Sequence, residues 1–247
     1  STGSSLMAVK YDLKSYSSLP STNDLAKALA KKNAPAWTAV LAARQTRGKG
    51  RRTNSWHSPS GGMYLSVILH PKSSKHLQLL TFAAALCVTK AIRKRYGIQT
   101  SIKWPNDILL DGRKVCGILT ETMFAQRITA IVGIGLNLNQ RDFPKEISGR
   151  ATSLFLATGR KEDARGFASL ILESFIPYYA HFEKGDHKKI LDEWKKNCST
   201  LGKNITIIEQ SRTFSAKAVG VNSEGMLRVR TKGGKMRTLL DAQISVR

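Results

Sequence analysis

Four runs of β-type residues follow one another in the middle of this chain, at 100–104, 108–110, 115–121 and 128–139. Asp111-Gly112 separates the second run from the third, and an Asp-Gly pair between two such runs is typical of a tight β-hairpin. Two further runs precede them, at 37–44 and 63–69. Because these runs are so dense, the sequence predicts that they are strands of one sheet.

Four other segments have the spacing of helices, namely 21–33, 76–96, 164–182 and 186–197. The first begins at Ser21-Thr22-Asn23-Asp24, where a hydroxyl or Asn side chain can cap the backbone. In the second, Leu80, Ala84, Cys87 and Ala91 share one face, and Gly97 ends the helix. We expect these helices to back the sheet.

The pattern changes after Leu201-Gly202-Lys203, where short β-type runs occur at 205–208, 214–221, 226–231 and 236–240. Glycine-containing turns at 222–225 and 232–235 separate them, which is typical of a small β-barrel. The sequence therefore predicts an α+β protein. Residues 8–201 form a mixed β-sheet backed by helices, residues 202–247 form a small β-barrel domain, and residues 1–7 are a leader outside the fold.

The charge is strongly positive, since 40 Lys and Arg face 17 Asp and Glu for a net charge of +23. Such an excess is compatible with nucleic-acid binding. The cations are dispersed along the chain rather than gathered in one tail. This dispersal favours a solvated basic surface that attracts acidic ligands or acidic protein partners.

The three cysteines, Cys87, Cys116 and Cys198, are far apart in the sequence. Their odd number and spacing argue against a disulfide framework and against a protein metal site. No apolar run reaches the roughly eighteen residues that a membrane span requires, and residues 1–7 lack the core of a signal peptide. We therefore expect a cytoplasmic protein that does not enter a membrane.

Glycines and cations are combined in the segment Gln45-Thr46-Arg47-Gly48-Lys49-Gly50-Arg51-Arg52, which Trp56 follows. Glycines allow backbone amides to approach a ligand, and Lys and Arg bind phosphate or carboxylate. The segment fails the dinucleotide fingerprint at Thr53, and a P-loop motif is not present. An exposed basic turn is the alternative interpretation.

Lys103-Trp104-Pro105-Asn106-Asp107 is a second candidate, because the proline forces a bend that can turn Asn106 and Asp107 toward a pocket. A proline turn with a capping Asp is the alternative. Lys114 follows a predicted hairpin, and a lysine at such a position is usually a solvated surface charge. Gly133-Ile134-Gly135 interrupts an apolar strand; the glycines permit close backbone approach, and a β-bulge is the plainer explanation.

The order of these motifs is more specific than any one of them. It runs Ser21-Thr22-Asn23, Gln45 with Gly48-Lys49-Gly50-Arg51-Arg52 and Trp56, Lys103-Trp104-Pro105-Asn106-Asp107, Lys114 with Gly117-Ile118-Leu119, and Gly133-Ile134-Gly135-Leu136-Asn137. This series resembles the biotin protein ligases, the biotin–[acetyl-CoA-carboxylase] ligase family, over residues 16–140. The tail from residue 202 is similar to that family's SH3-like C-terminal domain. The resemblance implies a catalytic domain of the class II synthetase and biotin/lipoate ligase type.

The resemblance also implies a reaction in two steps. ATP activates the biotin carboxylate as biotinyl-5′-AMP, and a lysine of a biotin carboxyl carrier domain then displaces AMP. Biotin and ATP are the substrates, and Mg²⁺ is carried by the ATP phosphates. Neither step needs a nucleophile of the enzyme, and the sequence offers no convincing one. Preorganised cations are needed instead, because a carboxylate and a phosphate repel each other.

By motif position, the implied catalytic residues are Arg51, Lys114 and Asp107. The implied biotin-binding residues are Ser21, Thr22, Asn23, Gln45, Gly48, Lys49, Arg51, Lys114, Gly117, Gly133 and Gly135. The implied ATP- and adenylate-binding residues are Lys49, Gly50, Arg51, Arg52, Trp56, Lys103, Asn106, Lys114 and Asn137. Within these sets, Trp56 packs near the adenine, and Asp107 orients or deprotonates the incoming lysine. Two residues depart from the family pattern: Lys49 stands where Arg is usual, and Thr53 where Gly is common.

Three further expectations follow from the resemblance. Only residues 1–20 precede the first motif, too few for the DNA-binding domain of some members, so a monofunctional ligase without specific DNA binding is expected. Members occur as monomers and as homodimers, and either is compatible with this chain. The excess positive charge suits an acidic carrier domain.

Two other functions remain as alternatives. A lipoate or octanoate protein ligase shares the fold class, but its Arg-Arg-x-Ser-Gly-Gly-Gly pattern is replaced here by Arg51-Arg52-Thr53-Asn54. A basic nucleic-acid-binding protein with an SH3-like tail rests on the net charge alone.

Overall fold

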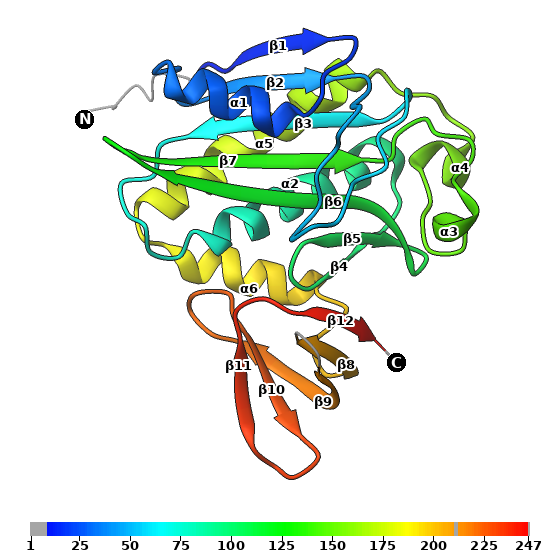
Figure 1. Ribbon diagram of the computed structural model, residues 1–247. Helices are drawn as coiled ribbons and strands as arrows, with labels where there is room; N and C mark the ends of the chain where they lie inside the picture. The colour runs from blue at the N-terminus through cyan, green and yellow to red at the C-terminus, as the bar shows by residue number, and fades with distance from the viewer. Residues whose placement is uncertain (1–8, 210–211, 247) are drawn as a thin grey trace, which may run out of the picture.

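Two β-sheets organise the computed structural model, which describes residues 9–209 and 212–246 (Figure 1). The larger sheet has seven strands in the order β1 (Asp12–Tyr16), β2 (Thr38–Ala42), β3 (Met63–Leu69), β7 (Ile128–Leu136), β6 (Arg113–Phe124), β5 (Asp107–Leu110) and β4 (Ser101–Lys103). β1 and β2 are parallel, whereas the other neighbours are antiparallel, so the predicted mixed sheet is confirmed.

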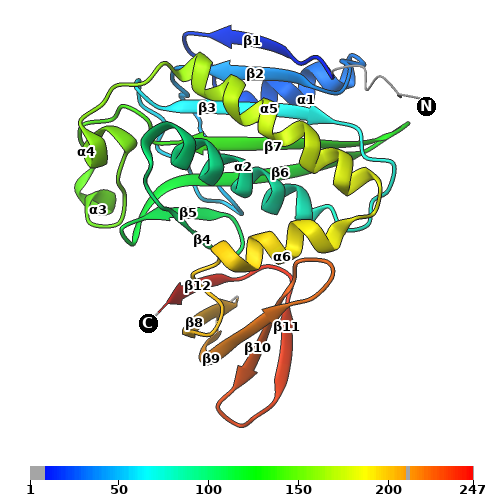
Figure 2. The same cartoon turned by 180° about the vertical axis from the view of Figure 1, so that it is seen from behind.

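Helices cover the two faces of this sheet unequally (Figures 1 and 2). α2 (Gln78–Tyr96) and α5 (Ala164–Glu183) lie on one face, and α1 (Thr22–Lys31) lies on the other. α2 is buried on most of its sides rather than on one stripe, because the sheet, α5 and α6 (His187–Asn197) surround it. The sequence predicted these four helices, but it could not show that α2 is a central helix.

The capping prediction for α1 is confirmed. Ser21 is its N-cap, and the Ser21 side chain accepts a hydrogen bond from the Asp24 backbone N–H. Ala26 and Ala30 of α1 pack on Ile68 and Ile131 of the sheet. Along β7 the same face continues from Ile131 to Gly133, which lies against Asn23 in the first turn of the helix. The helix therefore leaves room for a pocket at its N-terminal end.

The second sheet is antiparallel and contains β11 (Met236–Leu239), β10 (Leu227–Thr231), β9 (Arg212–Val221), β8 (Asn204–Glu209) and β12 (Gln243–Val246), in this order. Its β9–β10 turn rests on the helical layer. There the Trp104 indole N–H donates to the Gly225 carbonyl at 3.0 Å, and the Phe82 ring lies against Gly225. Phe82 in turn stacks on Trp194 of α6, with ring centroids 4.0 Å apart.

Several elements were not expected from the sequence. β1 and β12 are short strands, and α3 (Lys145–Ser148) and α4 (Leu154–Thr158) are short helices in the connection after β7. The bulge interpretation of Gly133-Ile134-Gly135 is wrong, because β7 keeps a continuous register with both neighbours through these residues. The predicted leader over residues 1–7 lies outside the described residues. No helix within 9–209 and 212–246 is long and apolar enough to cross a membrane.

Candidate active site

A cavity of about 790 Å³ opens where α1, the loop between β2 and β3, the ends of β5, β6 and β7, and the segment before β12 converge. Every residue that the resemblance implied as catalytic or ligand-binding, except Gly48, lines this cavity. The lining residues from that set are Ser21, Thr22, Asn23, Gln45, Lys49, Gly50, Arg51, Arg52, Trp56, Lys103, Asn106, Asp107, Lys114, Gly117, Gly133, Gly135 and Asn137. Motifs scattered over more than a hundred residues therefore meet at one place.

Gly48 has a structural role in the loop between β2 and β3. A Cβ at this position would stand 2.3 Å from the Ser58 hydroxyl and 2.5 Å from the Trp56 carbonyl. The Gly48 carbonyl accepts the Trp56 backbone N–H at 2.9 Å. Only glycine allows the loop to close on itself this tightly, so Gly48 shapes the loop without lining the cavity.

The floor of the cavity is made of glycines on neighbouring strands. Gly117 of β6 pairs with Gly135 of β7, and the Trp56 side chain lies over both. A Cβ at Gly135 would meet the Trp56 indole nitrogen at 2.5 Å, and a Cβ at Gly117 would meet the same ring at 3.0 Å. A Cβ at Gly133 would stand 2.2 Å from the Asn23 amide oxygen. A larger residue would not fit at these three positions, because the side chains of Trp56 and Asn23 lie directly on the strands there.

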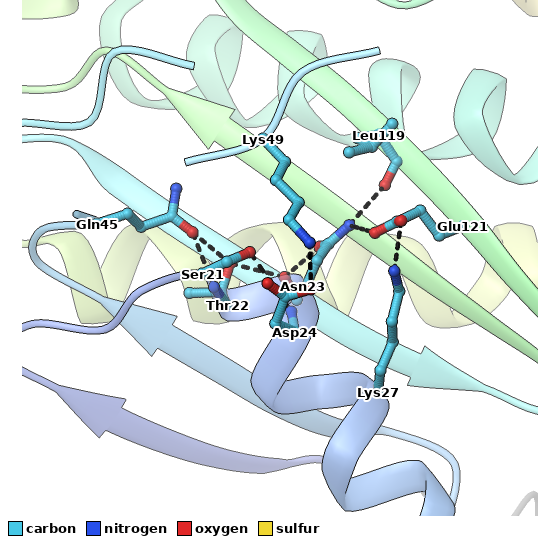
Figure 3. A network of polar contacts seen from close by, with 10 residues as sticks. Ser21, Thr22, Asn23, Asp24, Lys27, Gln45, Lys49, Leu119 and Glu121 are labelled. Atoms are coloured by element: carbon cyan, nitrogen blue, oxygen red, sulfur yellow. Dashed lines mark hydrogen bonds and ion pairs between the residues drawn. The ribbon is translucent and has the colours of Figure 1, made fainter. Parts of the chain in front are cut away.

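One end of the cavity is lined by hydroxyls and amides from α1 and the β2–β3 loop (Figure 3). The Gln45 side-chain oxygen accepts hydrogen bonds from the Thr22 backbone N–H at 2.8 Å and from the Thr22 hydroxyl at 3.1 Å. The Gln45 amide nitrogen donates to Ser58 at 3.0 Å. Ser21, Thr22 and Asn23 are almost fully buried. This end is a fixed set of neutral donors and acceptors, suited to a small polar ring system.

The other end is cationic. The Lys114 ammonium lies 2.6 Å from the Asp107 carboxylate and 4.8 Å from the centre of the Trp56 ring. Burial lowers the pKa of Lys103; the nearby carboxylate of Asp107 raises it, and the positive charge of Lys114 lowers it further. These groups gather positive charge at one end of the cavity, and the partial burial of Lys103 strengthens its attraction for an anion.

Arg51 extends this end from the loop. Its guanidinium donates to the Asn106 side-chain oxygen at 3.3 Å, while the Asn106 amide nitrogen donates to the Ile118 carbonyl at 2.7 Å. Burial lowers the pKa of Arg51 to about 10, a value at which the guanidinium keeps its charge at neutral pH. Asn106 therefore presents its oxygen to Arg51 and aims the arginine into the cavity.

The β2–β3 loop is held from two sides. Lys49 forms an ion pair with Asp24 of α1, with a nitrogen–oxygen distance of 2.6 Å. Arg51 forms an ion pair with Asp241, and the Arg52 Nε lies 3.1 Å from the same carboxylate. Asp241 belongs to the segment that connects β11 and β12, so the C-terminal sheet contributes an anchor to the loop.

Sequence reasoning missed part of the lining. The segment before and within β12 contributes Ala242, Gln243 and Ile244, and the connection after β7 contributes Phe143, Pro144, Ile147, Arg150 and Ala151. The Lys114 backbone N–H donates to the Arg150 carbonyl at 2.8 Å, which fixes this connection beside β6. None of these residues belongs to a recognisable motif, and only the folded chain brings them to the cavity.

One polar group of the site also serves the framework. The Asn137 amide nitrogen donates to the Thr152 carbonyl at 3.0 Å, so it holds the connection after β7 as well as lining the cavity. Among the described residues, no group of three or more His, Cys, Asp or Glu side chains could hold a metal ion.

Comparison with known proteins agrees with this geometry. Residues 16–139 match the Biotin/lipoate A/B protein ligase family, and residues 200–247 match the Biotin protein ligase C terminal domain. The chain is 40% identical over 222 residues to the bifunctional ligase/repressor BirA of Bacillus subtilis, covering 87% of this chain and 68% of that protein. It is 32% identical over 210 residues to the biotin–[acetyl-CoA-carboxylase] ligase of Paracoccus denitrificans, covering 81% of this chain and 86% of that protein.

A solved structure is similar as well. The biotin protein ligase from Aquifex aeolicus in complex with biotin and ATP superimposes with a TM-score of 0.83 and 31% sequence identity, covering 96% of this chain and 98% of that one.

Proposed function

The chain belongs to the biotin protein ligase family, and we propose that it joins biotin to ATP as biotinyl-5′-AMP and then transfers the biotinyl group to a lysine of a carrier domain. The observation that carries this proposal is the division of one cavity into a neutral polar end and a cationic end, with the glycine floor and Trp56 between them. A ligand with a polar ring and a distant carboxylate fits that division.

In the first step, an oxygen of the biotin carboxylate attacks the α-phosphorus of ATP and pyrophosphate leaves. Two anions must approach each other for this, and Arg51 and Lys114 stand on opposite elements where both anions can be contacted. Both cations already have fixed partners, Asn106 for Arg51 and Asp107 for Lys114. Little reorganisation is then needed as negative charge accumulates on the transferring phosphoryl group.

In the second step, the amine of the acceptor lysine attacks the acyl carbonyl, loses a proton, and AMP leaves. Asp107 is the carboxylate of the site that can orient that amine or accept its proton. It lies 2.6 Å from Lys114, so the two groups form one unit at the point where carboxylate and phosphate meet. We infer that Asp107 acts on the incoming amine and Lys114 acts on the bound anions.

The remaining residues bind the two substrates. Ser21, Thr22, Asn23 and Gln45 would hold the ureido ring of biotin, while Trp56, Asn106 and Asn137 would contact the nucleotide. Arg52, Lys49, Lys103 and Gly50 would contribute charge and backbone amides around the phosphates. Mg²⁺ would be bound by ATP phosphate oxygens, because Asp107, the carboxylate among the described residues of the cavity lining, is paired with Lys114.

The polar end distinguishes biotin from lipoate on physical grounds. A cyclic urea presents two N–H donors and a carbonyl acceptor, all of which need partners when buried. The dithiolane ring of lipoate has no such groups, so it could not use the hydrogen-bonding capacity that Ser21 and Asn23 keep beyond their contacts within the protein. The site therefore favours a biotin ligase over a lipoate ligase.

The acceptor would be the biotin carboxyl carrier domain of a biotin-dependent carboxylase. This proposal is supported by the relative named biotin–[acetyl-CoA-carboxylase] ligase and by the +23 net charge, which suits an acidic carrier. The three free cysteines support a reducing, cytoplasmic setting. A homodimer and the lack of specific DNA binding stay predictions.

The direct test is to incubate the protein with Mg-ATP and either biotin or lipoate, and to look for the acyl-adenylate by mass spectrometry. We expect biotinyl-5′-AMP with biotin and no adenylate with lipoate. Formation of lipoyl-AMP at a comparable rate would assign the lipoate alternative. No adenylate from either acid, in protein shown to be folded, would overturn the proposal and favour nucleic-acid binding, which a salt-dependent DNA titration would then measure.

A further inference from the structure

The Asn23 amide is held on three sides (Figure 3). Its nitrogen donates to the Glu121 carboxylate at 2.8 Å and lies 3.4 Å from the Leu119 carbonyl. Its oxygen accepts from the Ser66 hydroxyl at 2.6 Å. Asn23 is 4% exposed, so these contacts replace water almost completely. A buried amide in such a setting has one favoured orientation.

Glu121 decides which orientation that is. Its carboxylate forms an ion pair with Lys27 one turn along α1, and in this state it can only accept hydrogen bonds. The Leu119 carbonyl is also an acceptor only. A flipped Asn23 would direct its oxygen at these two acceptors and lose both donor contacts. The Asn23 oxygen is therefore turned away from Glu121, toward Ser66.

Gly133 in the floor of the cavity makes room for this oxygen. The Asn23 amide lies against Gly133, whose missing Cβ would otherwise stand 2.2 Å from the Asn23 oxygen. An amide oxygen has two lone pairs, and Ser66 uses one of them. The second lone pair can accept a hydrogen bond from a ligand in the cavity that Asn23 lines.

Neighbouring groups supply the complementary donor. The Ser21 side-chain oxygen accepts the Asp24 backbone N–H as the helix cap, which leaves its hydroxyl hydrogen to donate. The polar end thus presents an acceptor from Asn23 and a donor from Ser21. This is the pattern that one N–H and the carbonyl of a cyclic urea require.

We propose that Glu121, supported by Lys27, is a positioning residue that fixes Asn23 as an acceptor for a ureido N–H and thereby sets the preference of the cavity for biotin. This inference rests on the proposed function. Glu121 and Lys27 lie behind Asn23, outside the lining of the cavity, and act on the ligand only through it.

The test is Glu121→Gln, because glutamine keeps the size but can present either an oxygen or an NH₂ group to Asn23. We expect biotin to bind about tenfold more weakly by calorimetry, since a hydrogen bond to a charged group is lost and Asn23 is freed to flip. The KM for ATP and the kcat at saturating biotin should stay within about threefold, a split that a general loss of structure would not give.

Glu209→Gln is the matched control. Glu209 forms an ion pair with Arg237 at 2.8 Å in the C-terminal sheet, and the Glu209 and Glu121 side chains are similarly exposed, 29% and 27%. The Glu209→Gln variant should bind biotin with the affinity of the unmodified protein. A second measurement repeats Glu121→Gln in an Asn23→Ala background, where we expect no further loss of biotin affinity.

Unchanged biotin affinity in Glu121→Gln would overturn the inference, and so would an equal loss in the Asn23→Ala background. If Glu121→Gln does not fold, Lys27→Gln takes its place, with an expected loss of about threefold because the carboxylate remains but is less firmly held. Unchanged biotin affinity in Lys27→Gln would also refute the inference that Glu121 positions Asn23. Failure of the unmodified protein to bind biotin would instead refute the proposed function.

Discussion

Gly135→Ala isolates the role of the glycine floor under Trp56. The added Cβ would stand 2.5 Å from the indole nitrogen and 2.7 Å from the neighbouring ring carbon. Carbon atoms in good contact are roughly 3.5–4.0 Å apart, so the indole must move by about 1 Å. The strand itself can accept alanine, since β7 keeps regular pairing at this position.

The displaced ring would have to move away from the glycine floor, into the cavity that it lines. Trp56 is confined by Gly117 on the adjacent strand and by the Lys114 ammonium, 4.8 Å from the ring centre. Overpacking of this kind costs about 1–3 kcal/mol. If that cost falls on the conformation that binds the nucleotide, kcat/KM for ATP should fall by about 5- to 150-fold, because about 1.4 kcal/mol corresponds to a factor of ten.

The assay is pyrophosphate release at saturating biotin over a range of ATP concentrations, with thermal unfolding measured in parallel. Gly220→Ala is the control, because a Cβ at this position in β9 meets nothing within 4 Å. We expect Gly220→Ala to match the unmodified protein. An unchanged kcat/KM for ATP in folded Gly135→Ala would refute the argument that the glycine exists for Trp56.

Three other changes test separate parts of the structure. Lys114→Ala should lower the rate of adenylate formation by about 10²–10³, as for other preorganised charges, and a near-normal rate of pyrophosphate release would show that the cationic end is misassigned. Asp241→Asn should free the loop that Arg51 and Arg52 tie to the C-terminal sheet, so limited trypsin digestion should cut this loop several-fold faster without ligands; an unchanged cleavage pattern would contradict the anchor. The pKa of His187 is lowered by burial and then by the charge of His76, so the folded state favours neutral His187 and loses stability as pH falls below about 6.5. His187→Gln should therefore flatten the fall of the unfolding midpoint between about pH 7.5 and pH 5.5, and an equal slope in both proteins would exclude this histidine as the cause.

Local sequence patterns predicted many of the helices and strands. β3 spans 63–69 as expected, and the Asp111-Gly112 turn joins β5 and β6, because both signals depend on a few adjacent residues. β1 escaped notice because its exposed, polar residues lack the alternation of a half-buried strand. Its position is set by parallel pairing with β2, a contact with no local signature.

The candidate site shows the same limit. The motifs identified lining residues because their residue types at those spacings are needed for anion and ureide binding. Asp241 is a single carboxylate in a short connection, and its contact with Arg51 depends on how the C-terminal sheet docks. The glycines of β7 were noticed, but their purpose was not settled, since whether a strand bulges or carries a side chain flat against it is decided by tertiary contacts.

The attachment of the C-terminal sheet limits how a substrate can enter. Buried side chains form one continuous cluster from Phe82 and Trp194 to Ile205, Leu227 and Val229, and the Trp104–Gly225 hydrogen bond crosses the same boundary. A hinge between the two sheets would have to tear this cluster open, exposing large apolar surfaces to water. The β2–β3 loop is attached differently, through the ion pairs Lys49–Asp24 and Arg51–Asp241 between partly exposed side chains, so it can move without exposing an apolar core.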